Sequence, residues 1–103
     1  MENFGLDSET GGLIKTFFSG FEEIEKVKIF GSRAKGNYKP NSDIDFAVYG
    51  QFDDKFTLHL LSGLDELATP YRFDVVNYNT IENENLKQNI DESGKTFYKK
   101  QRR

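Results

Sequence analysis

The sequence predicts an α/β protein in which a small mixed sheet is flanked by helices. Apolar residues recur at helical spacing in three segments, and short apolar runs between turn residues mark three strands. The short connector between the first two strands permits antiparallel pairing, whereas a helical segment between the second and third favours a right-handed parallel crossover. Strand two is therefore expected to be antiparallel to strand one and parallel to strand three.

The N-terminal half is predicted to hold one helix and two strands. Residues 7–8 can cap the helix and residues 19–20 fit its end, since Asp and Ser favour the start of a helix and Gly its end. Residues 27–30 form the first strand, 31–41 a turn or short helix closed by a proline, and 43–49 the second strand. The apolar stripe of the helix comprises Leu13, Ile14, Phe17, Phe18 and Phe21.

The C-terminal half is predicted to continue as helix, strand, helix. The first helix covers residues 55–68 and stops before Thr-Pro, a strand covers 71–78, and the last helix ends near 93–94. Residues 96–98 are expected to dock on the body of the protein, and 99–103 to be a solvated basic tail. The inward positions of the two helices are Phe56, Leu60, Leu61, Leu64, Leu67, Ile81, Leu86 and Ile90.

The composition is that of a globular chain and restricts the classes of function. A length of 103 residues suits a single domain spanning 1–103, and 36% hydrophobic with 30% charged residues is a globular balance. The net charge of −3 argues against strong nucleic-acid binding, which needs many cationic contacts with phosphates. Cysteine is absent and no apolar run reaches membrane-spanning length. We therefore expect a soluble cytoplasmic protein without a membrane partner.

Three acidic side chains are predicted to meet a glycine–serine corner at one edge of the sheet. Asp43 and Asp45 share one face of the second strand, and Asp74 lies in the third. The predicted topology brings the starts of these strands to the end of the first strand, which Gly31 and Ser32 follow. Paired carboxylates bind divalent cations, and such a corner offers backbone N–H groups and a hydroxyl to a polyphosphate. The combination predicts phosphoryl or nucleotidyl transfer.

The cations and the single histidine are less informative. Arg33, Lys35 and Lys39 lie in the connector and can neutralise phosphate charge, but a solvated side chain is an equal alternative for each. A salt bridge to a neighbouring cation is the alternative for Asp74, because an unpaired charge among apolar residues is costly. His59 adjoins the leucine stripe of its helix and is expected to pack or lie on the surface.

Three motifs together resemble the minimal nucleotidyltransferase family of the DNA polymerase β-like superfamily. They are Gly31-Ser32-Arg33-Ala34-Lys35-Gly36, Ser42-Asp43-Ile44-Asp45-Phe46-Ala47-Val48 and Phe73-Asp74-Val75-Val76. The likeness extends from the first helix to a C-terminal Ile…Glu-x-Gly…Tyr pattern in residues 90–98. Two positions depart from the family pattern: Lys35 stands where Arg is common, and Ser93 interrupts a Glu-Gly pair.

The resemblance implies a polymerase β-like fold, ATP as the substrate and two Mg²⁺ ions. It implies HEPN-type all-helical partners, with this chain as an MntA-type antitoxin that transfers AMP to a hydroxyl, on a tyrosine of the toxin. A hetero-oligomer is therefore expected. The implied catalytic and metal-binding residues are Asp43, Asp45 and Asp74, and the implied nucleotide-binding residues are Gly31, Ser32, Arg33, Lys35 and Ser42.

Two other functions are compatible with the same residues. The chain could neutralise a toxin by binding alone, with nucleotide bound but not turned over. It could also transfer a nucleotide to a small hydroxylated molecule whose pocket a partner subunit completes. Larger enzymes of the superfamily carry an acceptor-binding domain that this sequence lacks, so the acceptor is expected to dock from outside.

Overall fold

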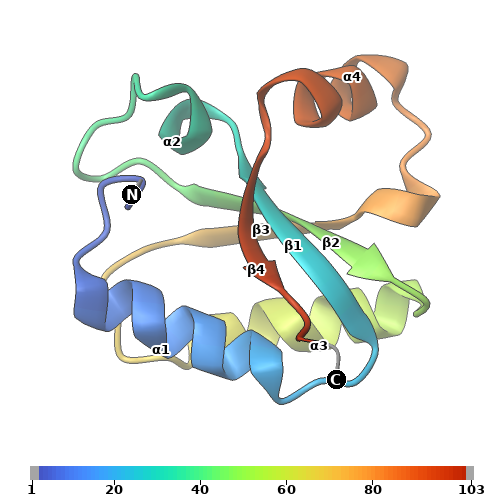
Figure 1. The fold of residues 1–103 in the computed structure, drawn as a ribbon, viewed down its shortest axis with the longest axis horizontal. Helices are drawn as coiled ribbons and strands as arrows, with labels where there is room; N and C mark the ends of the chain where they lie inside the picture. The colour runs from blue at the N-terminus through green and yellow to red at the C-terminus, as the bar shows by residue number, and fades with distance from the viewer. Residues whose placement is uncertain (1–2, 102–103) are drawn as a thin grey trace.

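The computed structural model describes residues 3–101, in which a four-stranded sheet carries helices on both faces (Figure 1). The strands are β1 (Ile24–Phe30), β2 (Ile44–Gly50), β3 (Phe73–Asn77) and β4 (Lys95–Lys99). The helices are α1 (Ser8–Ser19), α2 (Ser32–Lys35), α3 (Asp54–Asp65) and α4 (Glu84–Ser93), and a 3-10 turn, η1 (Tyr78–Thr80), precedes α4.

The sheet has the mixed topology that the sequence predicts. Its strand order is β3-β2-β1-β4, with β2 antiparallel to β1 and parallel to β3. Helix α3 makes the crossover between the two parallel strands. Phe30 pairs with Asp45, and Asp45 pairs with Asp74. The end of β1 therefore lies beside the starts of β2 and β3.

The two faces of the sheet are covered unequally. Helices α1 and α3 lie side by side under one face, where most of the core is found (Figure 1). Phe18 of α1 meets Phe46 of β2 edge to face, with 5.1 Å between ring centroids. Helix α4 covers the other face over a small buried cluster of Phe30, Ala47 and Ile90. Side chains alternate along β2, so Asp45 points to the same face as Ala47.

The predicted starts of α1 and α3 are confirmed to within one residue, whereas the last helix, expected to follow Thr80, begins only at Glu84, and α3 ends earlier than predicted. Asp7 caps α1 by accepting from the Thr10 N–H, and Asp53 caps α3 by accepting from the Phe56 N–H. Helix α3 ends at Asp65 rather than at residue 68. The next N–H, of Glu66, donates to both the Ser62 and Gly63 carbonyls, which tightens the last turn before the chain leaves the helix.

Strand boundaries differ from the predicted ones by up to three residues. Strand β1 begins at Ile24, which is fully buried and pairs with Gly50 across a register shift. Strand β2 begins one residue after Asp43. Strand β3 is shorter than 71–78, because the Asn77 side chain accepts from the Asn79 N–H and turns the chain into η1. These shifts leave the predicted order of elements intact.

The fourth strand, β4, was not predicted from the sequence. Residues 96–98 were expected only to dock, and Phe97 is indeed buried, but the segment also pairs antiparallel with β1. The expected solvated tail is wrong at Lys100, whose ammonium group binds the carboxylate of Glu22 at 3.1 Å. Residues 102–103 of that tail lie outside the described residues.

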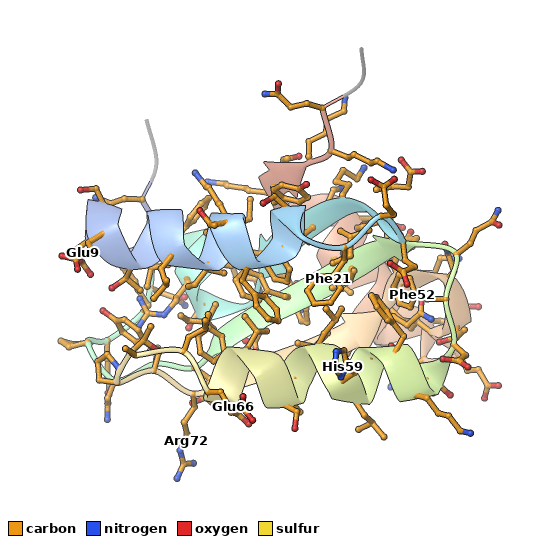
Figure 2. All side chains as sticks on the ribbon, turned by 90° about the horizontal axis from the view of Figure 1, so that it is seen from below. Glu9, Phe21, Phe52, His59, Glu66 and Arg72 are labelled. Atoms are coloured by element: carbon orange, nitrogen blue, oxygen red, sulfur yellow. The ribbon has the colours of Figure 1, made fainter. Side chains whose placement is uncertain are left out.

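Of the two positions expected for the histidine, packed or at the surface, the structure shows the exposed one. His59 lies on the outer side of α3, with its ring 6.1 Å from that of Phe21 (Figure 2). None of the helices within residues 3–101 combines the length and the apolar character needed to cross a membrane.

Candidate active site

The backbone positions of the three predicted carboxylates lie at the same end of the neighbouring strands β2 and β3. Asp45 and Asp74 are directly paired across the parallel strands β2 and β3, which places their Cα atoms about 5 Å apart. Both residues lie on the face of the sheet that α4 covers, because they alternate with residues packed under α1 and α3. Asp43 directly precedes β2, two residues before Asp45. The topology thus collects the acidic positions as the sequence predicts.

The electrostatics of Asp45 reflect its burial and its two acidic neighbours. Burial raises the pKa of the Asp45 carboxyl above its ordinary value, and the negative charges of Asp74 and Asp43 raise it further. Asp45 is half-buried, whereas Asp43 and Asp74 are exposed. The exposure of Asp74 differs from the apolar setting expected for it, since its side chain points to the solvent at the edge strand. A divalent cation would relieve this repulsion.

Gly31 forms the corner that faces Asp45. Its backbone has φ +75° and ψ −153°, a region open essentially to glycine alone. A Cβ atom at this position would lie 2.6 Å from Oδ2 of Asp45, so only glycine lets the chain pass so close to the carboxylate. The turn then enters α2, where the Gly31 and Ser32 carbonyls accept from Lys35 and Gly36. Ser32, half-buried, therefore follows directly on the contact with Asp45.

The donor set fits Mg²⁺ in chemical type. Asp43, Asp45 and Asp74 supply carboxylate oxygens, the ligands that hard divalent cations prefer. Within residues 3–101, no three acidic, histidine or cysteine side chains are already arranged to hold a metal ion. The carboxylates would have to turn toward a common centre, and both exposed members have room to do so.

Arg33 is not brought to the carboxylates as a phosphate ligand. Its side chain is only 2% exposed and points into the connector. Nε and Nη2 donate to the Ser42 carbonyl at 3.2 and 2.9 Å, and Nη1 donates to the Phe4 carbonyl at 2.9 Å. The guanidinium lies over the rings of Tyr38 and Tyr71, with its Cζ 5.2 and 5.0 Å from their centroids. The donors of Arg33 are thus engaged by backbone carbonyls, and its predicted part in nucleotide binding stays a prediction.

Ser42 bonds within the connector, and the two lysines of the connector are exposed. The Ser42 hydroxyl accepts from the Lys39 N–H at 2.8 Å and closes a turn, so it faces the connector. The side chains of Lys35 and Lys39 are exposed. No local signal in the sequence marks the parts played by Phe4, Tyr38 and Tyr71, because these residues are far apart in the chain.

Comparison with known proteins agrees with this geometry. Residues 13–103 match the family described as "Polymerase beta, Nucleotidyltransferase". The chain belongs to this family of nucleotidyltransferases, and it has the polymerase β-like fold. No curated protein matches the sequence significantly.

Solved structures with the same fold come from toxin–antitoxin complexes. A chain of a toxin–antitoxin complex with AMP-PNP is 26% identical, with a TM-score of 0.71 over 93% of this chain and 76% of that one. A chain of the MntA–HepT complex is 21% identical, with a TM-score of 0.68 over 90% of this chain and 73% of that one. The tri-AMPylated HEPN toxin of Shewanella oneidensis in complex with its MNT antitoxin provides a third, 20% identical, with a TM-score of 0.68 over 91% and 73%. These structures are similar to the chain in fold.

Proposed function

We propose that this chain is a single-domain, Mg²⁺-dependent nucleotidyltransferase that transfers AMP from ATP to a tyrosine hydroxyl of a HEPN partner, and so acts as an antitoxin. The observation that carries the proposal is the pairing of Asp45 with Asp74 beside the Gly31 corner. The similarity to chains from toxin–antitoxin complexes, one holding AMP-PNP and one an AMPylated toxin, supports the choice of nucleotide and partner.

The residues of the cluster have complementary parts in the proposed reaction. Asp43, Asp45 and Asp74 would hold the Mg²⁺ ions. When bound, the ions supply neutralisation of the triphosphate charge and a lower barrier to deprotonation of the attacking hydroxyl. The Gly31 backbone and the Ser32 hydroxyl would hold the two terminal phosphates, which leave as pyrophosphate when the acceptor oxygen bonds to the α-phosphorus. Asp74 would orient the acceptor hydroxyl and receive its proton.

The position of Asp74 supports an acceptor that comes from another molecule. Strand β3 is an edge strand, and the Asp74 side chain is exposed. An acceptor hydroxyl can therefore approach this carboxylate from the solvent without crossing the core. The triphosphate would lie on the other side of Asp45, at the end of β1 where Gly31 and Ser32 follow. The carboxylates thus separate a nucleotide side from an acceptor side, as in-line displacement requires.

Incubation with α-labelled ATP, Mg²⁺ and the co-purifying partner tests this function. We expect label on the partner, mapped by mass spectrometry to a tyrosine, and its loss when Asp43 and Asp45 are both replaced by Asn. The matched control Asp65→Asn removes one exposed charge from the end of α3 and should label normally. A double variant that transfers label as well as the wild type would refute the proposal. Toxin protection by an inactive double variant would instead indicate neutralisation by binding alone.

A further inference from the structure

The buried guanidinium of Arg33 joins α2 to the N-terminal segment and to the connector before β2, next to the candidate site. Its donors reach the carbonyls of Ser42, Phe4 and Pro40, at 2.9, 2.9 and 3.4 Å for the closest contact with each. We propose that Arg33 is a positioning residue, which holds Ser32 and Asp43 at the separation that metal binding by the three carboxylates needs. The proposal rests on the proposed function, because it takes Asp43 as a metal ligand.

Among the described residues, backbone carbonyls compensate the buried charge of Arg33. Burying a guanidinium is costly unless its donors are paired, and here backbone carbonyls accept from all three nitrogens. The guanidinium also lies over the rings of Tyr38 and Tyr71, which add cation–π attraction. A planar fork with several fixed donors fits this arrangement, and a lysine ammonium group does not. The surroundings of this side chain are thus specific for arginine.

The contacts connect directly to the residues of the candidate site. Arg33 follows Ser32 in the chain, and the carbonyl that receives two of its hydrogen bonds belongs to Ser42, which precedes Asp43. The Ser42 carbonyl, the Asp43 N–H and the Asp43 Cα lie in one planar peptide unit. Fixing the Ser42 carbonyl therefore also fixes the positions of the Asp43 N–H and Cα. Arg33 therefore links the serine on the nucleotide side to an aspartate on the metal side.

The same guanidinium brings the N-terminal segment into this support. The Phe4 carbonyl accepts from Nη1, and Phe4 itself has an uncommon positive φ of 57°. Gly5 follows with φ +78° and lies so close to Tyr38 that a Cβ atom would be 2.7 Å from the Cζ of the ring. The Tyr38 ring thus contacts Gly5 and also carries the guanidinium of Arg33 over it. A change at Gly5 should reach the site through this ring.

Two variants and one control separate positioning from direct phosphate binding. Arg33→Lys keeps the charge and removes the fork, while Gly5→Ala pushes the Tyr38 ring and leaves Arg33 in place. Arg72→Lys is the matched control, since Arg72 is exposed and extends away from the body of the protein (Figure 2). For each we would measure Mn²⁺ binding in the presence of AMP-PNP by electron paramagnetic resonance, and the affinity for AMP-PNP without metal. Amide hydrogen exchange of residues 40–45 reports the position of the connector without any ligand.

Positioning predicts a specific pattern of results. Mn²⁺ binding should weaken about tenfold or more in Arg33→Lys, with a smaller loss in Gly5→Ala, as supporting residues of metal sites typically show. Exchange in residues 40–45 should speed up in both, while metal-free AMP-PNP affinity should stay within about twofold of wild type. Arg72→Lys should match wild type throughout.

The opposite pattern would overturn the inference. A large loss of metal-free AMP-PNP affinity in Arg33→Lys, with unchanged exchange and unchanged behaviour of Gly5→Ala, would make Arg33 a phosphate ligand. If Arg33→Lys does not fold, Gly5→Ala decides alone, because normal exchange and normal Mn²⁺ binding in that variant refute the link. If the wild type itself binds no Mn²⁺ with AMP-PNP, the proposed function fails, and the proposal that Arg33 positions a metal ligand fails with it. If the wild type binds Mn²⁺ and the variants bind it equally well, only the positioning proposal is refuted.

Discussion

Replacing Gly31 by alanine is expected to lower nucleotidyl transfer far more than it lowers stability. The new methyl group would lie 2.6 Å from Oδ2 of Asp45, whereas ordinary contact begins at 3.4 Å. The carboxylate would therefore have to move by about 0.8 Å, and a displacement near 1 Å in a catalytic constellation costs up to about 100-fold in rate. We expect a loss of about 10- to 100-fold in transfer.

The positive φ of Gly31 adds a cost in stability that must be measured separately. An alanine in this backbone region costs about 1–3 kcal/mol. Gly36→Ala is the matched control, because Gly36 has φ +87° and a Cβ atom there would meet nothing within 4 Å, so it carries a backbone cost without the clash. Urea denaturation gives the free energy of unfolding of both variants, and transfer from α-labelled ATP to the co-purifying partner gives their rates.

The comparison of these two glycines decides the reasoning. Both variants should be folded at the assay temperature, and only Gly31→Ala should lose most of its activity. Should folded Gly31→Ala keep its rate within about twofold of wild type, the placement of Asp45 would not matter to the reaction. Equal losses in the two variants would attribute the effect to the backbone of the connector.

Three further predictions concern stability. Gly12→Ala should stabilise the protein by about 0.4–1 kcal/mol, because the position is helical and a Cβ atom there meets nothing within 4 Å; thermal unfolding would show it. Asn77→Ala should destabilise by about 1–3 kcal/mol in urea denaturation, since the buried amide donates to the Phe52 carbonyl at 3.1 Å. The Tyr78 hydroxyl donates to the Asp91 carboxylate, and this hydrogen bond raises the pKa of Tyr78 above its ordinary value of 10.0. The stabilisation by this hydrogen bond is therefore present below pH 10.0 and is lost as the pH rises through the raised pKa. The stability difference between wild type and Tyr78→Phe should therefore shrink at alkaline pH.

Matched variants make these measurements interpretable. Asn85→Ala removes an exposed amide from α4 and should change the free energy of unfolding by less than about 0.5 kcal/mol. Tyr98→Phe, in β4, controls for the loss of a tyrosine hydroxyl at high pH. A destabilised Gly12→Ala, a neutral Asn77→Ala or a pH-independent effect of Tyr78→Phe would each contradict the corresponding structural reason.

The order of elements and the sheet topology were predictable because they depend on local patterns. Helical spacing, caps such as Asp53 and turn residues are written in short stretches, and connection length then selects parallel or antiparallel pairing. Strand β4 was missed because nothing local distinguishes a five-residue strand from a docked tail. Its pairing with β1 joins residues far apart in sequence, for example Val27 with Tyr98. The early start of β1 likewise depends on the pairing of Ile24 with Gly50.

The acidic cluster was predictable and the support around it was not. The positions of Asp43, Asp45 and Asp74 followed from strand alternation together with topology. The hydrogen bonds of Arg33 were not predictable, because the connector sequence shows three cations and cannot show which of them meets backbone carbonyls. One of those carbonyls comes from Phe4, which reaches Arg33 only once the chain has folded.

Unequal covering of the sheet has a consequence for how the molecule opens. Helix α4 packs through its buried Ile90 on Phe30 and Ala47 and through the contact of Asp91 with Tyr78, whereas α1 and α3 share the larger main core. Segments with few buried contacts separate from the rest at a lower free energy than global unfolding requires. Since Asp45 and Asp74 lie on the same side of the sheet as α4, local opening of this helix is expected to expose the two carboxylates further without unfolding the main core.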